Sequence, residues 1–494
     1  MKKLLFSLIC LVMVLLVHVP ALSVGGAGEF DTSFSVQNLA DESAEIEVLF
    51  YDPAGNLTNV LLPNTVDNKI KAGENFTFDQ RYATGNPDPN NLSFLGTALV
   101  QADQDIGAVA NILRAGGIAP SFESYNAFDH LRIGQEVLLP QILKNVQSLG
   151  AIYNTTIVIQ NTDVNPANVI IVFRPDPIIN AQQGGTLTEL YTHTFIIPPL
   201  GQASLNQLST PGAAQIGAVF FGSARVIADR DVASVVYADG GGQQLFSFPS
   251  YPAGTLSPII LPSVYKEIPS FGDYYSTAML IVNFGDQDAK VEIEYLPSPD
   301  PLWTSTVVGT DIVTVTAKGA LNVDQRYALG ASSIKSAIFM GAAKVQSLNG
   351  QPIAIMTNLR GGTRYGTTYG GVMTGGRYGY VPIAYKEIYS GGYVWSSTVI
   401  VYNLESHLGD AVVRFKFYPS GREPFEDPNE YTVTDIRQFD LRYTTTVAGQ
   451  TSFIGSVKVE SVDGTPRSIG VLVQTRGIGE TGDALMSFLG LMEP

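Results

Sequence analysis

The side chains that most often carry catalysis or bind metals are scarce and scattered in this sequence. After the first 23 residues the histidines are His130, His193 and His407, which share no common position, and no cysteine follows Cys10. A tetrahedral zinc site needs clustered histidine or cysteine ligands. The sequence also lacks a Gly-x-Ser-x-Gly nucleophile turn, a Gly-x-x-x-x-Gly-Lys phosphate loop and a His-Glu-x-x-His helix. We therefore expect no enzymatic activity and no cofactor.

One oxygen-bearing residue recurs, and it suits either a calcium ion or a turn. Its four copies are Asp79, Asn206, Asp324 and Asp440, and in three of them an Arg stands two residues later. Calcium prefers clustered oxygens, whereas a residue that caps a turn needs only one oxygen to accept backbone N–H groups. Because Asn replaces Asp in the second copy, the sequence favours the turn, with calcium as the alternative.

The most distinctive candidate surface is the Tyr- and Gly-rich segment 361–380. It contains Tyr365, Tyr369 and Tyr378, with Arg364 between the glycines. One interpretation is a contact site for a sugar or a protein, because Tyr and Arg combine a large contact area with polar atoms. The other is a flexible link between repeats on which the tyrosines stack. The glycine content favours the second.

The elements that position these residues recur four times. Each copy has a strand that begins with an aromatic residue and reaches Asn eight positions later, and these Asn residues are 123, 122 and 120 positions apart. Alternate residues on one face are two apolar residues, a small hydroxyl and the aromatic residue, so we expect that face to be buried. Asn tolerates turn and left-handed conformations, which suits the start of a loop. The four strands are Phe30–Asn38, Tyr153–Asn161, Tyr275–Asn283 and Trp395–Asn403.

Further landmarks follow each of these strands in a fixed order. A second strand of alternating apolar residues ends at a proline, which cannot donate to a ladder, and a later strand opens with a glycine. The prolines are Pro53, Pro175, Pro297 and Pro419, and the glycines are Gly96, Gly222, Gly341 and Gly455. Self-similarity at this period indicates tandem copies of one unit. We predict four repeats, with bounds at 24–132, 133–254, 255–379 and 380–494.

The third and fourth repeats begin with an identical tetrapeptide, Tyr-Lys-Glu-Ile, at 265–268 and 385–388. A strand that faces only solvent would not need this identity. We therefore expect Tyr265 and Tyr385 to pack on the repeat that precedes each of them.

Several short strands per repeat, separated by turn signals and without a long amphipathic helix, predict an all-β protein of four antiparallel β-sandwiches. The aromatic-to-Asn strand, the alternating second strand and its terminal proline resemble tandem immunoglobulin-like β-sandwich repeats of secreted bacterial cell-surface proteins. The resemblance covers residues 24–494. It implies an immunoglobulin-like fold and an adhesive or structural role at the cell surface.

The first 23 residues predict export. Lys2 and Lys3 precede an apolar run, and Ala21-Leu22-Ser23 offers a small-residue cleavage site, so we interpret 1–23 as a signal peptide. No later stretch is long and apolar enough to cross a bilayer. The net charge of −16 disfavours binding to nucleic acid.

These observations predict a secreted, non-catalytic cell-surface or extracellular protein with a structural or adhesive role. Its partners would be a protein or a glycan at the cell surface, or further copies of itself. The apolar segment 484–489 could add to the edge of another sheet and so drive self-association. The alternative is an array of carbohydrate-binding modules.

Overall fold

The computed structural model describes residues 9–12, 29–79, 94–115, 121–128, 133–148, 150–210, 213–241, 244–252, 258–270, 273–298, 310–326, 333–334, 337–361, 365–371, 375–390, 392–443, 447, 450–462, 466–479 and 485–493. As predicted, the protein is all-β, with antiparallel sheets throughout the described residues. The helical segments with described bounds are α1 (Ile179–Gln182), η1 (Ala213–Ile216) and η2 (Ser406–Leu408), and Val447 is also helical. None of these helices could span a membrane.

Repeat 3 illustrates the architecture, because its two sheets are separate. One sheet has the strand order β19 (Ile259–Lys266), β25 (Phe339–Ser347), β22 (Ala289–Pro297) and β23 (Asp311–Val315). The other has the order β20 (Ile268–Ser270), β21 (Asp273–Asn283), β26 (Ile353–Gly361) and β27 (Tyr365–Gly370), with β24 (Ala320–Asp324) also paired to β21. The core between them contains Met279, Ile281, Val291 and Ile293. The predicted apolar face of the aromatic-to-Asn strand is therefore buried.

The other repeats are built from corresponding strands. Repeat 1 has β2 (Glu29–Asn38), β3 (Ala44–Tyr51), β4 (Leu57–Leu61), β5 (Lys69–Ile70), β6 (Asn75–Asp79), β7 (Thr97–Ala102), β8 (Ile106–Ala115) and β9 (Ser121–Asn126). Repeat 2 has β10 (Gly134–Lys144), β11 (Val146–Ser148), β12 (Ala151–Asn161), β13 (Ala167–Pro175), β14 (Tyr191–Ile197), β15 (Gln202–Asn206), β16 (Phe220–Asp239), β17 (Leu245–Pro249) and β18 (Tyr251–Pro252). Repeat 4 has β28 (Tyr378–Lys386), β29 (Ile388–Ser390), β30 (Tyr393–Asn403), β31 (Ala411–Pro419), β32 (Phe425–Glu426), β33 (Tyr431–Val433), β34 (Ile436–Asp440), β35 (Phe453–Ser461), β36 (Ile469–Gly479), β37 (Leu485–Leu489) and β38 (Leu491–Glu493).

Part of the predicted signal peptide also lies in a sheet. Ile9–Val12 forms β1, an edge strand paired antiparallel to β7. The remainder of 1–23 lies outside the described residues.

The strand order differs from that of an immunoglobulin domain. In that domain the last two long strands are neighbours in one sheet. Here they separate, since β25 pairs with β22 in one sheet and β26 pairs with β21 in the other. In repeat 2 both strands are parts of the single strand β16, which pairs with β13 in its first half and β12 in its second, so the two sheets merge. The antiparallel sheets were predicted correctly, but their connections are not those of the immunoglobulin fold.

The recurring Asn has the same buried role in all four repeats. Asn283 is fully buried, and its Nδ2 donates to the backbone oxygens of Gln287 at 2.7 Å and Val315 at 3.1 Å. Its Oδ1 accepts the N–H of Gly285 at 2.8 Å. None of the four Asn residues has a positive φ, so hydrogen bonds from the side chain, and not left-handed backbone, fix this position. The counterparts are Asn38, Asn161 and Asn403.

The recurring glycine is explained by a close approach of two backbones. Gly341 lies opposite Pro297, the residue that ends the second strand. A Cβ at Gly341 would stand 2.1 Å from the carbonyl oxygen of Leu296. The same clash would arise at Gly96, Gly222 and Gly455, so no side chain fits at this position.

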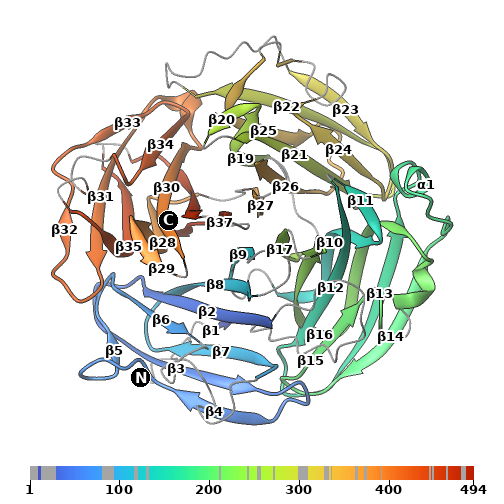
Figure 1. The fold of residues 1–494 in the computed structure, drawn as a ribbon, viewed down its shortest axis with the longest axis horizontal. Helices are drawn as coiled ribbons and strands as arrows, with labels where there is room; N and C mark the ends of the chain where they lie inside the picture. The colour runs from blue at the N-terminus through green and yellow to red at the C-terminus, as the bar shows by residue number, and fades with distance from the viewer. Residues whose placement is uncertain are drawn as a thin grey trace, which may run out of the picture.

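The sandwiches form a closed ring, with repeat 1 beside repeat 4 (Figure 1). Each hydrophobic core continues into the next repeat around the ring. Val158 and Tyr237 of repeat 2 join the core of repeat 1, and Val109 of repeat 1 joins the core of repeat 4. The other two joints are bridged in the same way by Leu280, Val282 and Met356 and by Ile400, Tyr402, Ile436 and Leu472. The repeats are therefore not a row of independent domains.

The centre of the ring is a hub of four short strands, one from each repeat. In Figure 1 these are β9, β17, β27 and β37, which contact one another in the closed order β9, β17, β27, β37, with a smaller contact between β9 and β27 across the centre. The Asn126 Oδ1 in β9 accepts a hydrogen bond from the backbone N–H of Leu489 in β37 at 3.0 Å, and the Asn126 Nδ2 donates to the carbonyl oxygen of Leu489 at 2.5 Å. The apolar C-terminal segment is consequently buried in the hub, where Leu485 is 1% exposed and Phe488 is 3% exposed. β37 is the last strand of its sheet, but residues 485–488 are buried in the hub, so the described part of this segment is not exposed for the predicted self-association.

Candidate binding sites at the joints

The Tyr- and Gly-rich segment does not form one surface. Tyr369 lies in the hub with 4% of its surface exposed, and its hydroxyl donates to the carbonyl oxygen of Ser263. Burial raises the pKa of Tyr369. This buried ring is not available as a surface contact, because β27 carries the segment inward to the centre of the ring.

The other three residues of that segment are placed differently. Tyr378 is half-buried in β28, with the Nζ of Lys458 4.1 Å from the centre of its ring. The backbone of Tyr365 begins β27, and Arg364 lies outside the described residues. A contact role for Tyr365, Tyr378 and Arg364 stays a prediction.

Three of the four copies of the recurring Asp form the turn that the sequence favoured, and the residues that follow Asp79 lie outside the described part of the chain. Asp324 Oδ1 accepts the backbone N–H of Arg326 at 3.0 Å, and its carboxylate also binds the Arg326 guanidinium at 2.6 Å. Asp440 and Arg442 repeat this arrangement. Asn206 makes the same turn by accepting the N–H of Leu208 at 2.9 Å. Among the described residues no group of three or more His, Cys, Asp or Glu could hold a metal ion.

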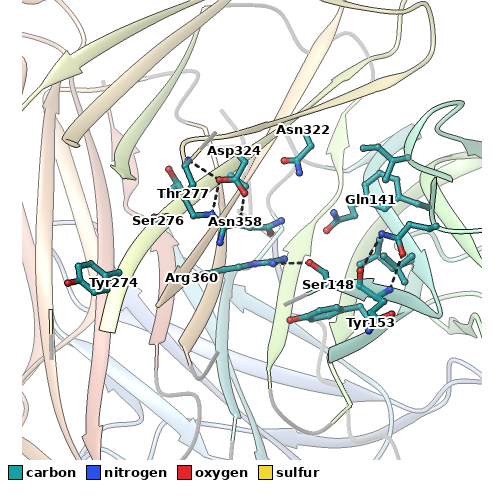
Figure 2. Close-up of a pocket in the computed structure, with 18 of the residues that line it drawn as sticks. Gln141, Ser148, Tyr153, Tyr274, Ser276, Thr277, Asn322, Asp324, Asn358 and Arg360 are labelled. Carbon is teal, nitrogen blue, oxygen red and sulfur yellow. Dashed lines mark hydrogen bonds and ion pairs between the residues drawn. The ribbon is translucent and has the colours of Figure 1, made fainter. Parts of the chain in front are cut away.

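These Asp–Arg pairs line cavities between neighbouring repeats. The cavity between repeats 2 and 3, which we name the joint 2–3 cavity, has a volume of about 380 Å³. Small-molecule sites commonly occupy about 300–1,000 Å³. In Figure 2, Asp324 and Asn358 lie on the side formed by repeat 3, and Ser148 and Tyr153 lie on the side formed by repeat 2.

Arg360 is the central charged side chain of the joint 2–3 cavity. It extends from β26 across the joint, where its Nη1 donates to Ser148 Oγ at 3.2 Å and its guanidinium lies 5.7 Å from the centre of the Tyr153 ring (Figure 2). Arg360 forms no ion pair with any described residue, and its buried Nε has no hydrogen-bond partner there. Burial lowers the pKa of Arg360. A partly buried cation without a carboxylate partner favours an anion beside it.

The cavity between repeats 3 and 4, the joint 3–4 cavity, has the same construction and a volume of about 320 Å³. Arg476 takes the place of Arg360 and lies 4.5 Å from the centre of the Tyr275 ring. Asp440 and Arg442 take the places of Asp324 and Arg326. Two joints therefore offer the same chemistry at equivalent positions.

The other two joints are filled. Between repeats 1 and 2, the fully buried Arg114 forms an ion pair with Asp239, which occupies the position of Arg360. Between repeats 4 and 1, Phe122 packs edge-on against Trp395, with ring centres 4.7 Å apart. Of the recurring aromatic residues, Tyr153 and Tyr275 line the two described cavities, whereas Trp395 packs against Phe122.

The residues that line the two cavities were not identified as a site from the sequence. A signal was present, because Arg360 and Arg476 precede Gly361 and Gly477, which lie opposite the recurring aromatic residue in the paired strand. The three histidines do not contribute. His193 lies in β14 and His407 in η2, neither of which lines these cavities, and His130 lies outside the described residues.

Comparison with known proteins gives no family. No protein-family model and no curated protein matches this sequence. The crystal structure of Thermotoga maritima 1070 aligns with 24% of this chain and 93% of its own, at 15% identity and a TM-score of 0.18. A tetra-tandem repeat in the extending region of a large adhesion protein aligns with 94% of this chain and 95% of its own, at 11% identity and a TM-score of 0.09. The BSP domain of a biofilm-associated protein aligns with 100% of this chain and 98% of its own, at 8% identity and a TM-score of 0.14. These TM-scores are too low to support an argument about fold or function.

Proposed function

We propose that this chain is a non-catalytic extracellular or cell-surface protein in which four copies of one β-sandwich unit form a rigid ring with a structural or adhesive role. The observation that supports this most strongly is the continuity of the hydrophobic cores through every joint, including the joint between repeats 4 and 1. Shared cores resist rotation of one unit against the next, so the ring can present several surfaces in fixed relative positions.

Export is part of this proposal. The charged start, apolar run and small-residue exit of residues 1–23 support cleavage of a signal peptide. Mass spectrometry of the protein from the culture medium or cell surface should give a chain that begins near residue 24. A chain that keeps residues 1–23 and stays inside the cell would contradict the proposal.

Partners would meet the outer rim of the ring. The rim strand β14 lies at the edge of its sheet, and the neighbouring apolar side chains Ile170 and Ile196 are 40% and 67% exposed. Edge strands with exposed apolar residues can pair with another chain. Negative-stain images of the native surface should therefore contain rings or ring assemblies. Ile196→Lys should reduce any self-association measured by light scattering, and unchanged assembly would exclude this edge.

The second candidate function is an array of carbohydrate-binding modules. The two polar cavities of equivalent construction favour it, because Asn, Asp, Arg and Tyr are side chains suited to hydroxylated ligands. Glycan-array binding by the purified ring would support this function. Binding that survives changes in both cavities would place the contact elsewhere on the protein.

A further inference from the structure

We propose that the joint 2–3 and joint 3–4 cavities are two equivalent sites for a sugar acid, a polyhydroxylated ring that carries one carboxylate. This inference gives the carbohydrate-binding alternative a ligand class and a location. It does not depend on the structural role proposed for the ring, because a rigid scaffold and a ligand site can coexist.

A carboxylate on the ligand is indicated by the hydrogen bonds that the charged side chains of the joint 2–3 cavity already make. Asp324 is bound by Arg326 through both a backbone and a side-chain hydrogen bond. Glu267, the other acid that lines the cavity, accepts the Ser276 hydroxyl at 3.1 Å. Among the described residues, the hydrogen-bond partner of the Arg360 guanidinium is the neutral Ser148. An entering carboxylate would therefore complete the interactions of this guanidinium, which is suited to bidentate binding.

The joint 3–4 cavity has the more positive lining. Its charged side chains are Arg442, Arg476 and Asp440. Asp440 is bound by Arg442, and two arginines with one aspartate give the described lining of this cavity a net positive charge. Such a positive cavity stands out in a chain with a net charge of −16.

The hydroxyl groups of the ligand are indicated by the amide side chains beside the arginines. Asn358 is 6% exposed, lines the joint 2–3 cavity, and its Oδ1 has no hydrogen-bond partner among the described residues. A buried acceptor of this kind is costly unless a donor reaches it. The hydroxyl of a bound sugar would supply that donor. Asn322 and Gln141 line the same cavity and offer further polar groups (Figure 2).

The two sites should differ in strength. In the joint 3–4 cavity Gln474 replaces Asn358, but its Oε1 already accepts the Tyr265 hydroxyl at 3.0 Å and its Nε2 donates to Ser263 Oγ at 3.2 Å. The Gln474 amide therefore already has hydrogen-bond partners for both its oxygen and its nitrogen when no ligand is bound. We expect the joint 2–3 site to bind the sugar acid more tightly than the joint 3–4 site.

Each cavity also has an exposed tyrosine in its lining. Tyr274 is 61% exposed at the joint 2–3 cavity, and Tyr443 is 76% exposed at the joint 3–4 cavity. An exposed ring can pack on the apolar face of a sugar, since it offers a large contact area at low entropic cost. A single carboxylate such as acetate would gain nothing from this ring, which distinguishes a sugar acid from a simple anion.

The test is calorimetric titration of the intact chain with galacturonate, glucuronate, galactose and acetate. We expect a uronate to bind at two sites per chain, at least about tenfold more tightly than galactose or acetate. Arg360→Gln should remove the tighter site and Arg476→Gln the weaker one. Arg225→Gln, which changes an arginine paired with Glu136 away from both cavities, is the matched control and should leave two sites.

Other outcomes would overturn the proposal. These are the absence of uronate binding at millimolar concentration, equal binding of galactose, equal binding of acetate, or two sites that persist in the Arg360→Gln and Arg476→Gln variants. If either variant fails to fold, the exposed position Tyr274 provides the second test, since Tyr274→Ala should weaken the tighter site alone. Failure of these experiments leaves the ring and its surface role intact, which the imaging experiment tests separately.

Discussion

The joint between repeats 1 and 2 and the joint between repeats 2 and 3 use an arginine in opposite ways. At the first, Arg114 is fully buried and paired with Asp239, and it donates to Ser121 Oγ at 2.6 Å. At the second, Arg360 borders a cavity of about 380 Å³ and has no carboxylate partner among the described residues. At the joint between repeats 1 and 2 the arginine is neutralised by an aspartate of the chain. At the joint between repeats 2 and 3 the arginine has no such carboxylate among the described residues, and we propose that it binds a ligand. The same backbone can therefore build a structural joint or a candidate site.

The largest effect should follow the loss of the buried pair. Arg114→Met leaves the Asp239 carboxylate without its cation, and removal of one partner of a buried pair costs about 3–5 kcal/mol. Because the side chain of Asp239 is 36% exposed, we expect about 3 kcal/mol in denaturant unfolding. The Asp239→Asn change should recover part of this loss in the double variant. A cost below that of Arg360→Met would refute the distinction between the joints.

A smaller effect should follow removal of the ring that fills the joint between repeats 4 and 1. Phe122 is half-buried against Tyr393 and Trp395, so Phe122→Ala should cost about 2 kcal/mol. A residue for comparison at a hollow joint is the exposed Tyr274, which lines the joint 2–3 cavity and for which Tyr274→Ala should cost less than about 0.5 kcal/mol. Equal losses in thermal unfolding would mean that the hollow joint is packed as tightly as the filled one.

A glycine packs against the tyrosine ring that lines each cavity, and an alanine at this position would test how tightly that ring is held. A Cβ at Gly361 would lie 2.3 Å from the Tyr275 ring, which lines the joint 3–4 cavity. Gly361→Ala should push this ring toward Arg476 and cost about 1–2 kcal/mol. Gly134→Ala is a control, because its nearest contact would be 3.8 Å away. The near-UV circular dichroism, to which the tyrosines contribute, should change only in the first variant.

The loss of stability at Arg360 itself should be smaller than the losses at Arg114, Phe122 and Gly361. Arg360→Met removes one hydrogen bond to Ser148 and leaves no carboxylate unpaired, so its cost should be below about 1 kcal/mol. Uronate binding would nevertheless be lost at this joint. A cost near that of Arg114→Met would indicate that Arg360 is a structural residue.

The sequence predicted the strands and landmarks because those depend on local chemistry. Asn283 must lie where a strand ends and Gly341 must lie opposite a backbone carbonyl, so each recurs at a fixed spacing. The closed ring of repeats could not be predicted from such local landmarks, because it depends on contacts between repeats. The identity of Tyr265 and Tyr385 indicated a contact but not its direction, and the prediction that they face the preceding repeat was wrong. Tyr265 donates to Gln474 of the following repeat, and Tyr385 joins the cluster that contains Phe122 of repeat 1.

The hub was missed for a different physical reason. Its strands are five or six residues long, too short for alternation to stand out. A weaker signal exists, since an aromatic residue preceded by Ser or Thr follows each recurring Asn after 85 to 87 residues, at Tyr125, Phe248, Tyr369 and Phe488. These residues meet only when all four repeats are in place, so no single repeat indicates why they recur.

The hydrogen bonds between Asn126 and Leu489 have a consequence for how such a chain can change through duplication. Linear repeat proteins tolerate the gain or loss of a unit, because each unit contacts only its neighbours and special terminal units cover the ends. In this chain the first unit covers the last, and no terminal cap is needed. A fifth copy, or a missing one, would leave two apolar faces without their partners, so closure fixes the copy number at which the molecule is stable.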